Sequence, residues 1–245
     1  MPTSAITTPT VAEFVATQLH AAASEPGHRL LILAPPHTGK THGVRHALAR
    51  ILTDHPTQRI TYATYDQRAA VYHEQMVRSM LPTRRTRTAL RPAATNQLLP
   101  NDPPANLVVI DDPVRDRDQA HSAIDRDVTW SWWTNIVTGH LAEHATVAVV
   151  MTPRHHDDLA GRLITRERTT LHGGPWNVLR LPAYADHNDP LGRPPGAPLP
   201  HPSLPTDRPD AWAAYWDRAR TRARTDDWHA QYTCQPPTPD TKDTP

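Results

Sequence analysis

Cysteine, glycine and phenylalanine are scarce in this 245-residue sequence, which has one, nine and one of them respectively. Because Cys234 stands alone, one chain can form neither an internal disulfide nor a cysteine-based zinc site, and a reducing compartment fits. No apolar run approaches the ~18 residues that a membrane span needs, and the N-terminus has no basic-then-apolar signal pattern. We therefore expect a soluble, intracellular protein without a membrane partner.

Lysine is also scarce, since Lys40 and Lys242 are the only lysines among the 26 basic side chains and the other 24 are arginines. The formal net charge of +1 gives no overall field that would indicate a nucleic-acid partner, although the arginines are clustered. With so few lysines and glycines, a Gly-Lys-[Ser/Thr] triplet is expected by chance only about 0.01 times in this chain. The Gly-Lys-Thr triplet at 39–41 is therefore unlikely to be a chance match to a phosphate-binding motif.

A short apolar run at 30–33 precedes that triplet, and an amphipathic helix with apolar residues at 44, 47, 48 and 51 follows it. This strand–loop–helix order is the context that a Walker A phosphate loop requires. Loop amides and the helix N-terminus would surround phosphate oxygens, Lys40 would bind the outer phosphates of ATP, and the Thr41 hydroxyl would ligate Mg²⁺. The alternative is an ordinary strand–turn–helix. The nucleotide-binding residues predicted by the motif are Pro36, His37, Thr38, Gly39, Lys40 and Thr41.

A second apolar run at 107–110 ends in Asp111, Asp112 and Pro113. Four apolar residues followed by two carboxylates indicate a buried parallel strand with acids at its C-terminal edge, where open α/β sheets bind ligands. We predict that Asp111 holds Mg²⁺ through water and that Asp112 polarises the attacking water as general base. The alternative is a simple Asp-Asp-Pro turn.

The remaining pattern predicts an α/β fold of the P-loop NTPase class, with a mostly parallel central sheet flanked by helices. Further helices are expected at 10–23, 65–80 and 115–138, and further strands at 59–63, 145–151 and 176–181. We expect an ATPase domain at 1–182, a proline-rich, partly helical extension at 183–235 and a disordered tail at 236–245.

Each of three further segments has two interpretations. Phe14 and Gln18 either touch adenine or are core and surface positions of the first helix, and the periodicity favours the latter. The basic cluster at 84–91 either meets a phosphate backbone or is a solvated loop. The tryptophans at 130, 132 and 133 favour packing over base stacking, on a helix whose apolar face is predicted to include Ile124, Val128, Trp132 and Ile136.

The strand at 145–151 leads into Thr152 and then into the run PRHHDDLAGRLI at 153–164. His155, His156, Asp157 and Asp158 invite a metal assignment, but adjacent residues rarely converge on one ion. An acidic helix N-cap is the favoured interpretation.

Together these segments resemble the large subunit of tailed-phage terminases, the ATP-driven motors that package viral DNA. The run MTPRHHDDLAGRL at 151–163 is similar to the family signature TRWHxDDLxGRL. The other matching segments are APPHTGKT at 34–41, YATY at 62–65, VIDDPV at 109–114, residues 125–133, Leu181-Pro182, DPLGR at 189–193, Gly196 and Gln231-Tyr232. The resemblance covers about residues 30–237, nearly the whole chain.

The resemblance implies an additional-strand ATPase domain that uses ATP and Mg²⁺ to translocate double-stranded DNA. It implies a homo-oligomeric ring at the procapsid portal in the host cytoplasm, with the portal protein and the small terminase subunit as partners. It also implies that Thr152 lies in the coupling motif that senses the γ-phosphate, which makes Lys40, Asp112 and Thr152 the expected catalytic residues.

The sequence departs from the family pattern at several positions. Ala34 replaces the first glycine of the phosphate loop, and Arg154 replaces the signature tryptophan. His37 stands where the family has a basic residue, usually an arginine finger, and Asp112 stands where a glutamate is common. Members normally continue into a nuclease domain, so we expect no nuclease activity from this chain and a separate nuclease subunit or a truncated gene product.

Three functions fit to different degrees. An ATP-hydrolysing packaging motor explains the phosphate loop, the paired aspartates and the 151–163 signature. A degenerate, non-hydrolysing nucleotide- or DNA-binding prophage remnant would explain His37, Ala34 and the missing nuclease. A general helicase-like ATPase explains the phosphate loop but not the signature.

Overall fold

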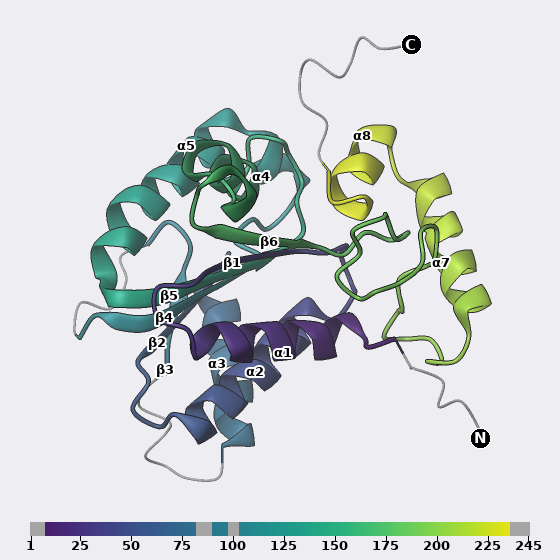
Figure 1. The fold of residues 1–245 in the computed structure, drawn as a ribbon. Helices are drawn as coiled ribbons and strands as arrows, with labels where there is room; N and C mark the ends of the chain where they lie inside the picture. Colours follow the sequence, from purple (N-terminus) through teal and green to yellow (C-terminus); the bar gives the residue numbers. More distant parts are fainter. Residues whose placement is uncertain (1–7, 82–89, 98–102, 236–245) are drawn as a thin grey trace.

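The computed structural model describes residues 8–81, 90–97 and 103–235. Its centre is a six-stranded sheet in which every pair of neighbouring strands is parallel (Figure 1). The strands are β1 (Arg29–Leu33), β2 (Ile60–Thr64), β3 (Leu90–Ala94), β4 (Ala105–Asp111), β5 (Leu141–Met151) and β6 (Trp176–Arg180).

The strands lie in the order β3-β2-β4-β5-β1-β6. Strand β5 therefore lies between β1, which carries the phosphate-loop motif, and β4, which ends in the paired aspartates. This inserted strand is the additional-strand arrangement, so the predicted fold class is confirmed.

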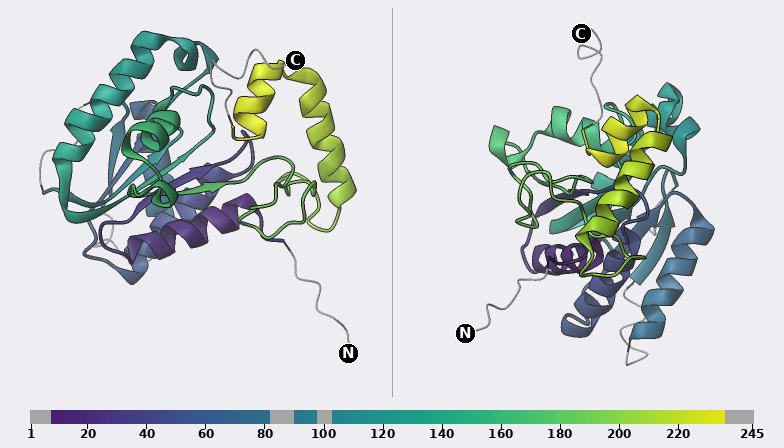
Figure 2. Two further views of the ribbon diagram at one scale, coloured as in Figure 1. Left: turned by 45° about the horizontal axis from the view of Figure 1, so that its top comes forward. Right: turned by 90° about the vertical axis from the view of Figure 1, so that its right-hand side faces the viewer.

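Helices cover both faces of the sheet (Figures 1 and 2). On one face lie α1 (Val11–Ala23), α2 (Lys40–Asp54) and α3 (Gln67–Met80), and on the other lie α4 (Arg117–His121), α5 (Ala123–Ser131) and α6 (Leu159–Arg162). Strand side chains alternate between two apolar cores, as in β1, where Leu30 and Ile32 face one core and Leu31 and Leu33 the other. Burial on both faces explains why these strands are continuous apolar runs.

Residues 183–235 pack beside the sheet at the end nearest the phosphate loop (Figure 2). They contain α7 (Pro209–Arg222), α8 (Thr225–Asp227) and the π-helical turn η6 (Trp228–Tyr232). Trp216 is fully buried in the same core as α1 and α2, and its indole donates to the carbonyl of Leu199 at 2.7 Å. A buried ion pair between Arg193 and Asp189, 2.6 Å apart, fixes the preceding loop. The division into an ATPase domain and an extension stays a prediction, and the predicted tail at 236–245 lies outside the described residues.

Shorter helical turns complete the described fold. They are η2 (Trp132–Val137), η3 (Thr138–His140), η4 (Leu163–Glu167) and η5 (Thr170–His172). No helix among the described residues is long and apolar enough to cross a lipid bilayer.

Two sequence predictions about elements were wrong. Strand β3 was missed, because Arg91 and Pro92 read as the end of a basic loop; the strand is at the sheet edge, where a proline lacking an N–H is tolerated. The helix expected at 115–138 is broken into α4, α5 and η2. As a result Ile124 and Val128, predicted to share a buried face, are 76% and 45% exposed, whereas Trp132 is buried.

The other open interpretations have different outcomes. Phe14 is buried in the core between α1 and α2, which confirms its packing role. Trp132 and Trp133 are likewise buried and pack against the sheet. Most of the basic cluster, residues 84–89, lies outside the described residues, and so does its predicted phosphate contact.

Candidate functional site: a cleft at the strand ends

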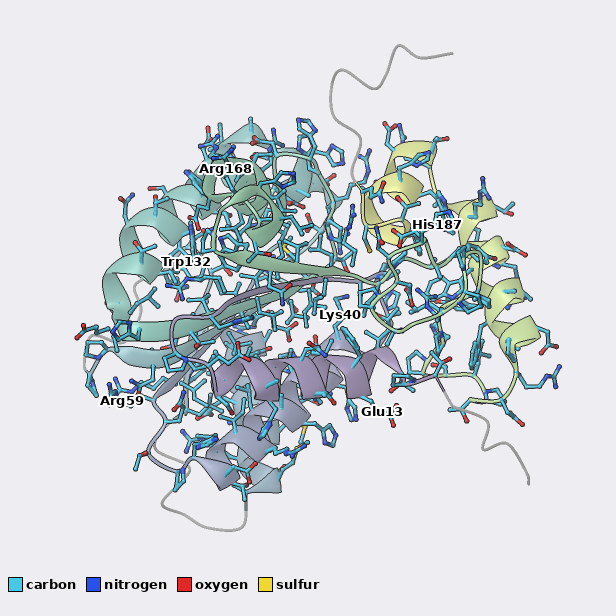
Figure 3. All side chains as sticks on the ribbon, viewed as in Figure 1. Glu13, Lys40, Arg59, Trp132, Arg168 and His187 are labelled. Carbon is cyan, nitrogen blue, oxygen red and sulfur yellow. The ribbon has the colours of Figure 1, made fainter. Side chains whose placement is uncertain are left out.

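The C-terminal ends of β1, β4 and β5 meet at a cleft of about 560 Å³, which we call the strand-end cleft. Figure 3 shows Lys40 at this end of the sheet, between the strands and residues 183–235. The side chains lining it come from the phosphate loop and α2, from the loops after β4 and β5, and from the extension. They are Pro36, His37, Gly39, Lys40, Thr41, His42, Arg45, Asp112, Thr152, Arg154, Pro202 and Ser203.

Lys40 is the buried cation of the cleft, with 4% of its surface exposed. Its amine donates to the carbonyl of Pro35 at 3.0 Å and to the Thr152 hydroxyl at 2.7 Å, and lies 3.6 Å from a carboxylate oxygen of Asp112. One ammonium therefore joins the ends of three neighbouring strands. Lysine can exchange such contacts for phosphate oxygens, since its three N–H donors rotate freely.

Asp112 is held in place from two sides. Its Oδ1 accepts from the backbone N–H of Thr152 at 2.7 Å, and its own N–H donates to the carbonyl of Val150 at 2.9 Å. Its φ of +43° places it in the left-handed region, which non-glycine residues seldom adopt. Such strain persists where surrounding contacts fix the conformation, and it is often found at functional sites.

Asp111 lies deeper, at the end of β4, and is 1% exposed. The Thr41 hydroxyl donates to its Oδ1 at 3.2 Å, and the Tyr62 hydroxyl donates to its Oδ2 at 2.9 Å. Burial, reinforced by the neighbouring Asp112 charge, raises the pKa of Asp111 to about 7. A cation bound beside a buried carboxylate stabilises its charged form.

The oxygens of Thr41 and Asp111 suit Mg²⁺. A hydroxyl and a carboxylate from two different elements converge here, and both are hard oxygen donors of the kind that magnesium prefers. Magnesium commonly uses one or two protein ligands together with waters and substrate phosphates. Among the described residues no group of three or more His, Cys, Asp or Glu side chains could hold a metal.

The loop after β5 is organised by Asp158, the N-cap of α6, which is 1% exposed. Its carboxylate accepts from the backbone N–H groups of Arg154, His155 and Gly161 at 2.9, 3.3 and 3.0 Å. The prediction of an acidic N-cap is therefore confirmed. These bonds fix the backbone that runs from Thr152 to α6.

Gly161 and Arg162 explain the remainder of the 151–163 signature in physical terms. A Cβ on Gly161 would lie 1.8 Å from the carbonyl oxygen of His156, so only glycine fits. Arg162 is buried and bonds with Asp157 and Asp127 at 2.6 and 2.7 Å, which ties α6 to α5.

We expect Gly161→Ala to displace the loop after β5, because the added methyl group clashes with backbone. Overpacking of this kind should cost about 2 kcal/mol and lower the melting temperature by roughly 4–8 °C in a chain of this size. Thermal unfolding by circular dichroism measures it. Gly139→Ala is the matched control, since nothing lies within 4 Å of its Cβ position; equal melting temperatures for the two variants would contradict the prediction.

His155 is a partly buried imidazole in the same loop. Burial, with the nearby Arg126 charge as the next cause, lowers its pKa to about 4. The unfolded chain takes up this proton near pH 6.5 and the folded chain only near pH 4, so acidification through this window lowers the free energy of unfolding. Its Nδ1 accepts from the Asp157 N–H at 3.0 Å, which an asparagine oxygen can also do.

Replacement of His155 by Asn should therefore make the protein less sensitive to acid. Between pH 7 and 4.5 the wild type should lose about 1–2 kcal/mol more of unfolding free energy than the variant, after allowance for solvent screening. Urea denaturation at both pH values measures the difference. Parallel losses in the two proteins would show that another group is responsible, and His144→Asn, at an exposed position, controls for general effects.

The two departures in the phosphate loop have different consequences. Ala34 has no positive φ and is fully buried, and its N–H donates to the Met151 carbonyl at 3.2 Å, so the position does not require glycine. His37 has a φ of +62° and lines the cleft, where it supplies an imidazole in place of a fixed positive charge.

Most of the predicted site residues come together, but their depths differ. Pro36, His37, Gly39, Lys40 and Thr41 line the cleft. Thr38 is buried beneath the loop, where its hydroxyl donates to the Pro35 carbonyl at 2.8 Å. Asp112 and Thr152 also line the cleft, while Asp111 contacts it through Thr41.

Sequence reasoning missed five residues that line the cleft, of which Arg154 appeared in the sequence only as a departure from the family signature. His42 and Arg45 follow Thr41 on α2, and the helical spacing from Thr41 to Arg45 would have indicated a shared face. Pro202 and Ser203 reach the cleft from the extension, and no local pattern indicates that long-range contact.

The sheet order and the strand-end cleft define an additional-strand α/β fold of the type found in terminase ATPase domains. The crystal structure of the HK97 bacteriophage large terminase matches this chain with a TM-score of 0.51 and 13% sequence identity. The match covers 90% of this chain and 48% of that chain, so this chain spans about half the length of that protein. The likeness confirms the predicted terminase-like fold. No protein-family model matches the sequence, and no curated protein matches it.

Proposed function

We propose that this chain is the ATP-hydrolysing motor domain of a terminase large subunit, which drives double-stranded DNA into a procapsid. The observation that carries the proposal is the contact of Lys40 with both Thr152 and Asp112 across three strand ends. A phosphate-binding lysine, a carboxylate that can polarise water and a hydroxyl at the end of the next strand thus surround one point. These are the components that hydrolysis of a terminal phosphate requires.

Each residue has a chemical task in this proposal. Lys40 and the loop amides of residues 36–41 bind the β- and γ-phosphates, and Asp112 orients the attacking water and accepts its proton. Thr41 and Asp111 hold Mg²⁺, which when bound neutralises charge on the phosphate oxygens. Thr152 joins Lys40 to Asp112 and so detects loss of the γ-phosphate when Lys40 changes partners.

Movement of DNA requires that this loss be transmitted to the rest of the chain. The Thr152 loop is fixed to α6 by Asp158, and α6 is fixed to α5 by Arg162. A change at Thr152 therefore reaches α5 and α6 through buried polar contacts. We propose that copies of the chain form a ring on the portal in the host cytoplasm, with duplex DNA and the small subunit as further partners.

The second candidate is a nucleotide-binding module that does not hydrolyse ATP. His37 favours it, because an imidazole stabilises the charge of the transition state less than a guanidinium does. Ala34 does not favour it, since its backbone has no need of glycine. The two candidates differ in turnover and not in nucleotide binding.

DNA-coupled turnover tests the motor proposal. ATP hydrolysis should rise when linear duplex DNA, portal protein and small terminase subunit are added, and the motor should displace a triplex-forming oligonucleotide from the duplex. Lys40→Ala, under the same conditions, sets the background. Turnover and displacement no higher than this background would exclude the motor and leave the binding module.

A further inference from the structure

Arg154 places a guanidinium in the strand-end cleft, and the proposed function assigns no role to this residue. It lines the cleft together with Lys40, Asp112 and Thr152, and its side chain is partly exposed. Of the three cationic side chains that line the cleft, Lys40 is bonded to Pro35 and Thr152, and Arg45 lies 3.4 Å from a His42 nitrogen. Among these three, the guanidinium of Arg154 makes no hydrogen bond or ion pair with any residue that the structure describes.

The backbone of Arg154, in contrast, is fixed. Its N–H donates to the buried Asp158 carboxylate at 2.9 Å. Two residues earlier, Thr152 bonds with both Asp112 and Lys40. Two residues of chain span at most about 7 Å, so the backbone of Arg154 is fixed close to the Thr152 position that contacts Lys40 and Asp112.

We propose that Arg154 binds an oxygen of the terminal phosphate of ATP in the same chain and stabilises the charge that develops there during hydrolysis. The inference rests on the proposed function, because it assigns a further catalytic residue to that site. A guanidinium presents two parallel N–H donors to phosphate oxygens and stays charged at every physiological pH. The imidazole of His37, which also lines the cleft, cannot present two parallel N–H donors, so the guanidinium absent from the phosphate loop is supplied from the loop after β5.

Arg154 takes part in hydrolysis only through its charge. A water oxygen forms a bond to the γ-phosphorus, and the bond from that phosphorus to the β,γ-bridging oxygen breaks, its electron pair leaving with ADP. The water proton passes to the Asp112 carboxylate. Arg154 forms and breaks no covalent bond; it balances the negative charge on the equatorial oxygens.

Three variants test the assignment: Arg154→Ala, Arg154→Lys, and Arg154→Ala combined with His37→Arg. We expect Arg154→Ala to lower kcat about 100-fold or more with a small change in KM, since a cationic finger acts mainly in the transition state. Lysine should restore part of the loss. An arginine at position 37 should recover at least about ten-fold of the lost kcat, because it supplies a guanidinium from the phosphate loop, which also lines the cleft. Arg50→Ala, on the exposed side of α2, is the control and should change nothing.

Equilibrium binding separates the failure of this inference from the failure of the proposed function. The affinities for ADP and for ATPγS are measured for the wild type and for each variant. This measurement does not require that the wild type hydrolyse ATP. Arg154→Ala should weaken ATPγS only a few-fold, in keeping with the small change in KM, and should leave the affinity for ADP unchanged. Equal weakening of both nucleotides, or no weakening of either, would overturn the assignment, whereas a wild type that discriminates but does not hydrolyse would overturn only the proposed function.

Mixing distinguishes action within a chain from action on a neighbour. Lys40→Ala chains bind the phosphates poorly but carry Arg154, and Arg154→Ala chains have the opposite defect. If Arg154 acts within its own chain, the mixture stays as inactive as its components. Turnover restored by mixing would overturn the assignment to the same chain.

Discussion

Replacement of Asp112 by Asn is expected to reduce ATP turnover by about 10²–10⁴-fold while leaving nucleotide binding nearly intact. Asparagine keeps the oxygen that accepts from the Thr152 N–H and tolerates the left-handed backbone at φ +43°, so the loop should keep its shape. What it loses is the basic oxygen that takes a proton from water. The loss should therefore appear in kcat and not in KM.

Asp116→Asn is the matched control for this variant. It makes the same chemical change four residues along the chain, at an N-cap position of α4 where asparagine is also favoured. Phosphate release at saturating ATP measures both proteins. Turnover in Asp112→Asn within a few-fold of the control would mean that another group activates the water.

Replacement of Lys40 by Met should have the largest effect on binding. Methionine fills the space of the buried stem but cannot donate to phosphate oxygens, and charge-assisted bonds of this kind contribute about 1.5–3 kcal/mol each. Affinity for ATP should fall at least about ten-fold, and turnover should fall further, since the charge also stabilises the transition state. Removal of the ammonium also deletes its contacts with Thr152 and Asp112.

Isothermal titration with ATP and Mg²⁺ measures this loss, beside Arg50→Met as a control on the same helix. Arg50 is exposed and pairs only weakly with Asp54 at 3.6 Å. Unchanged ATP affinity in Lys40→Met would show that the phosphate loop does not bind phosphate in this protein.

Local patterns were sufficient to predict the centre of the fold. The strand before Lys40 and the strand before Asp111 are unbroken apolar runs, because both faces of the sheet are covered. Their carboxyl ends had to meet at one edge once the sheet was parallel, and the structure brings Lys40, Asp112 and Thr152 together there. The catalytic and metal-binding roles of these residues stay predictions.

The features that the sequence did not reveal depend on long-range contacts. Within the described sheet, β3 pairs with one neighbour, β2, and packs against α3, and neither contact can be predicted from the local sequence around Pro92. Ile124 and Val128 have helical spacing but face solvent, because the helix breaks and turns as a π-helix at Trp132. The approach of Pro202 and Ser203 to the phosphate loop requires the whole extension to fold back over the sheet end.

Arg154 illustrates the same limit at the site itself. In the sequence Arg154 is a departure from the family signature, and no local pattern indicates where its side chain lies. Its placement depends on Asp158, whose carboxylate collects three backbone N–H groups and fixes the loop beside Asp112. Only the folded chain shows that the substituted residue lines the cleft.

The central claim is that the strand-end cleft is a centre for Mg²⁺-dependent ATP hydrolysis. The most direct measurement is release of inorganic phosphate from ATP by the purified chain, with Mg²⁺ and with EDTA. We predict release that requires Mg²⁺ and falls to background in Asp112→Asn. Release that persists in EDTA or in that variant, or no release by the wild type at any protein concentration, would contradict the claim.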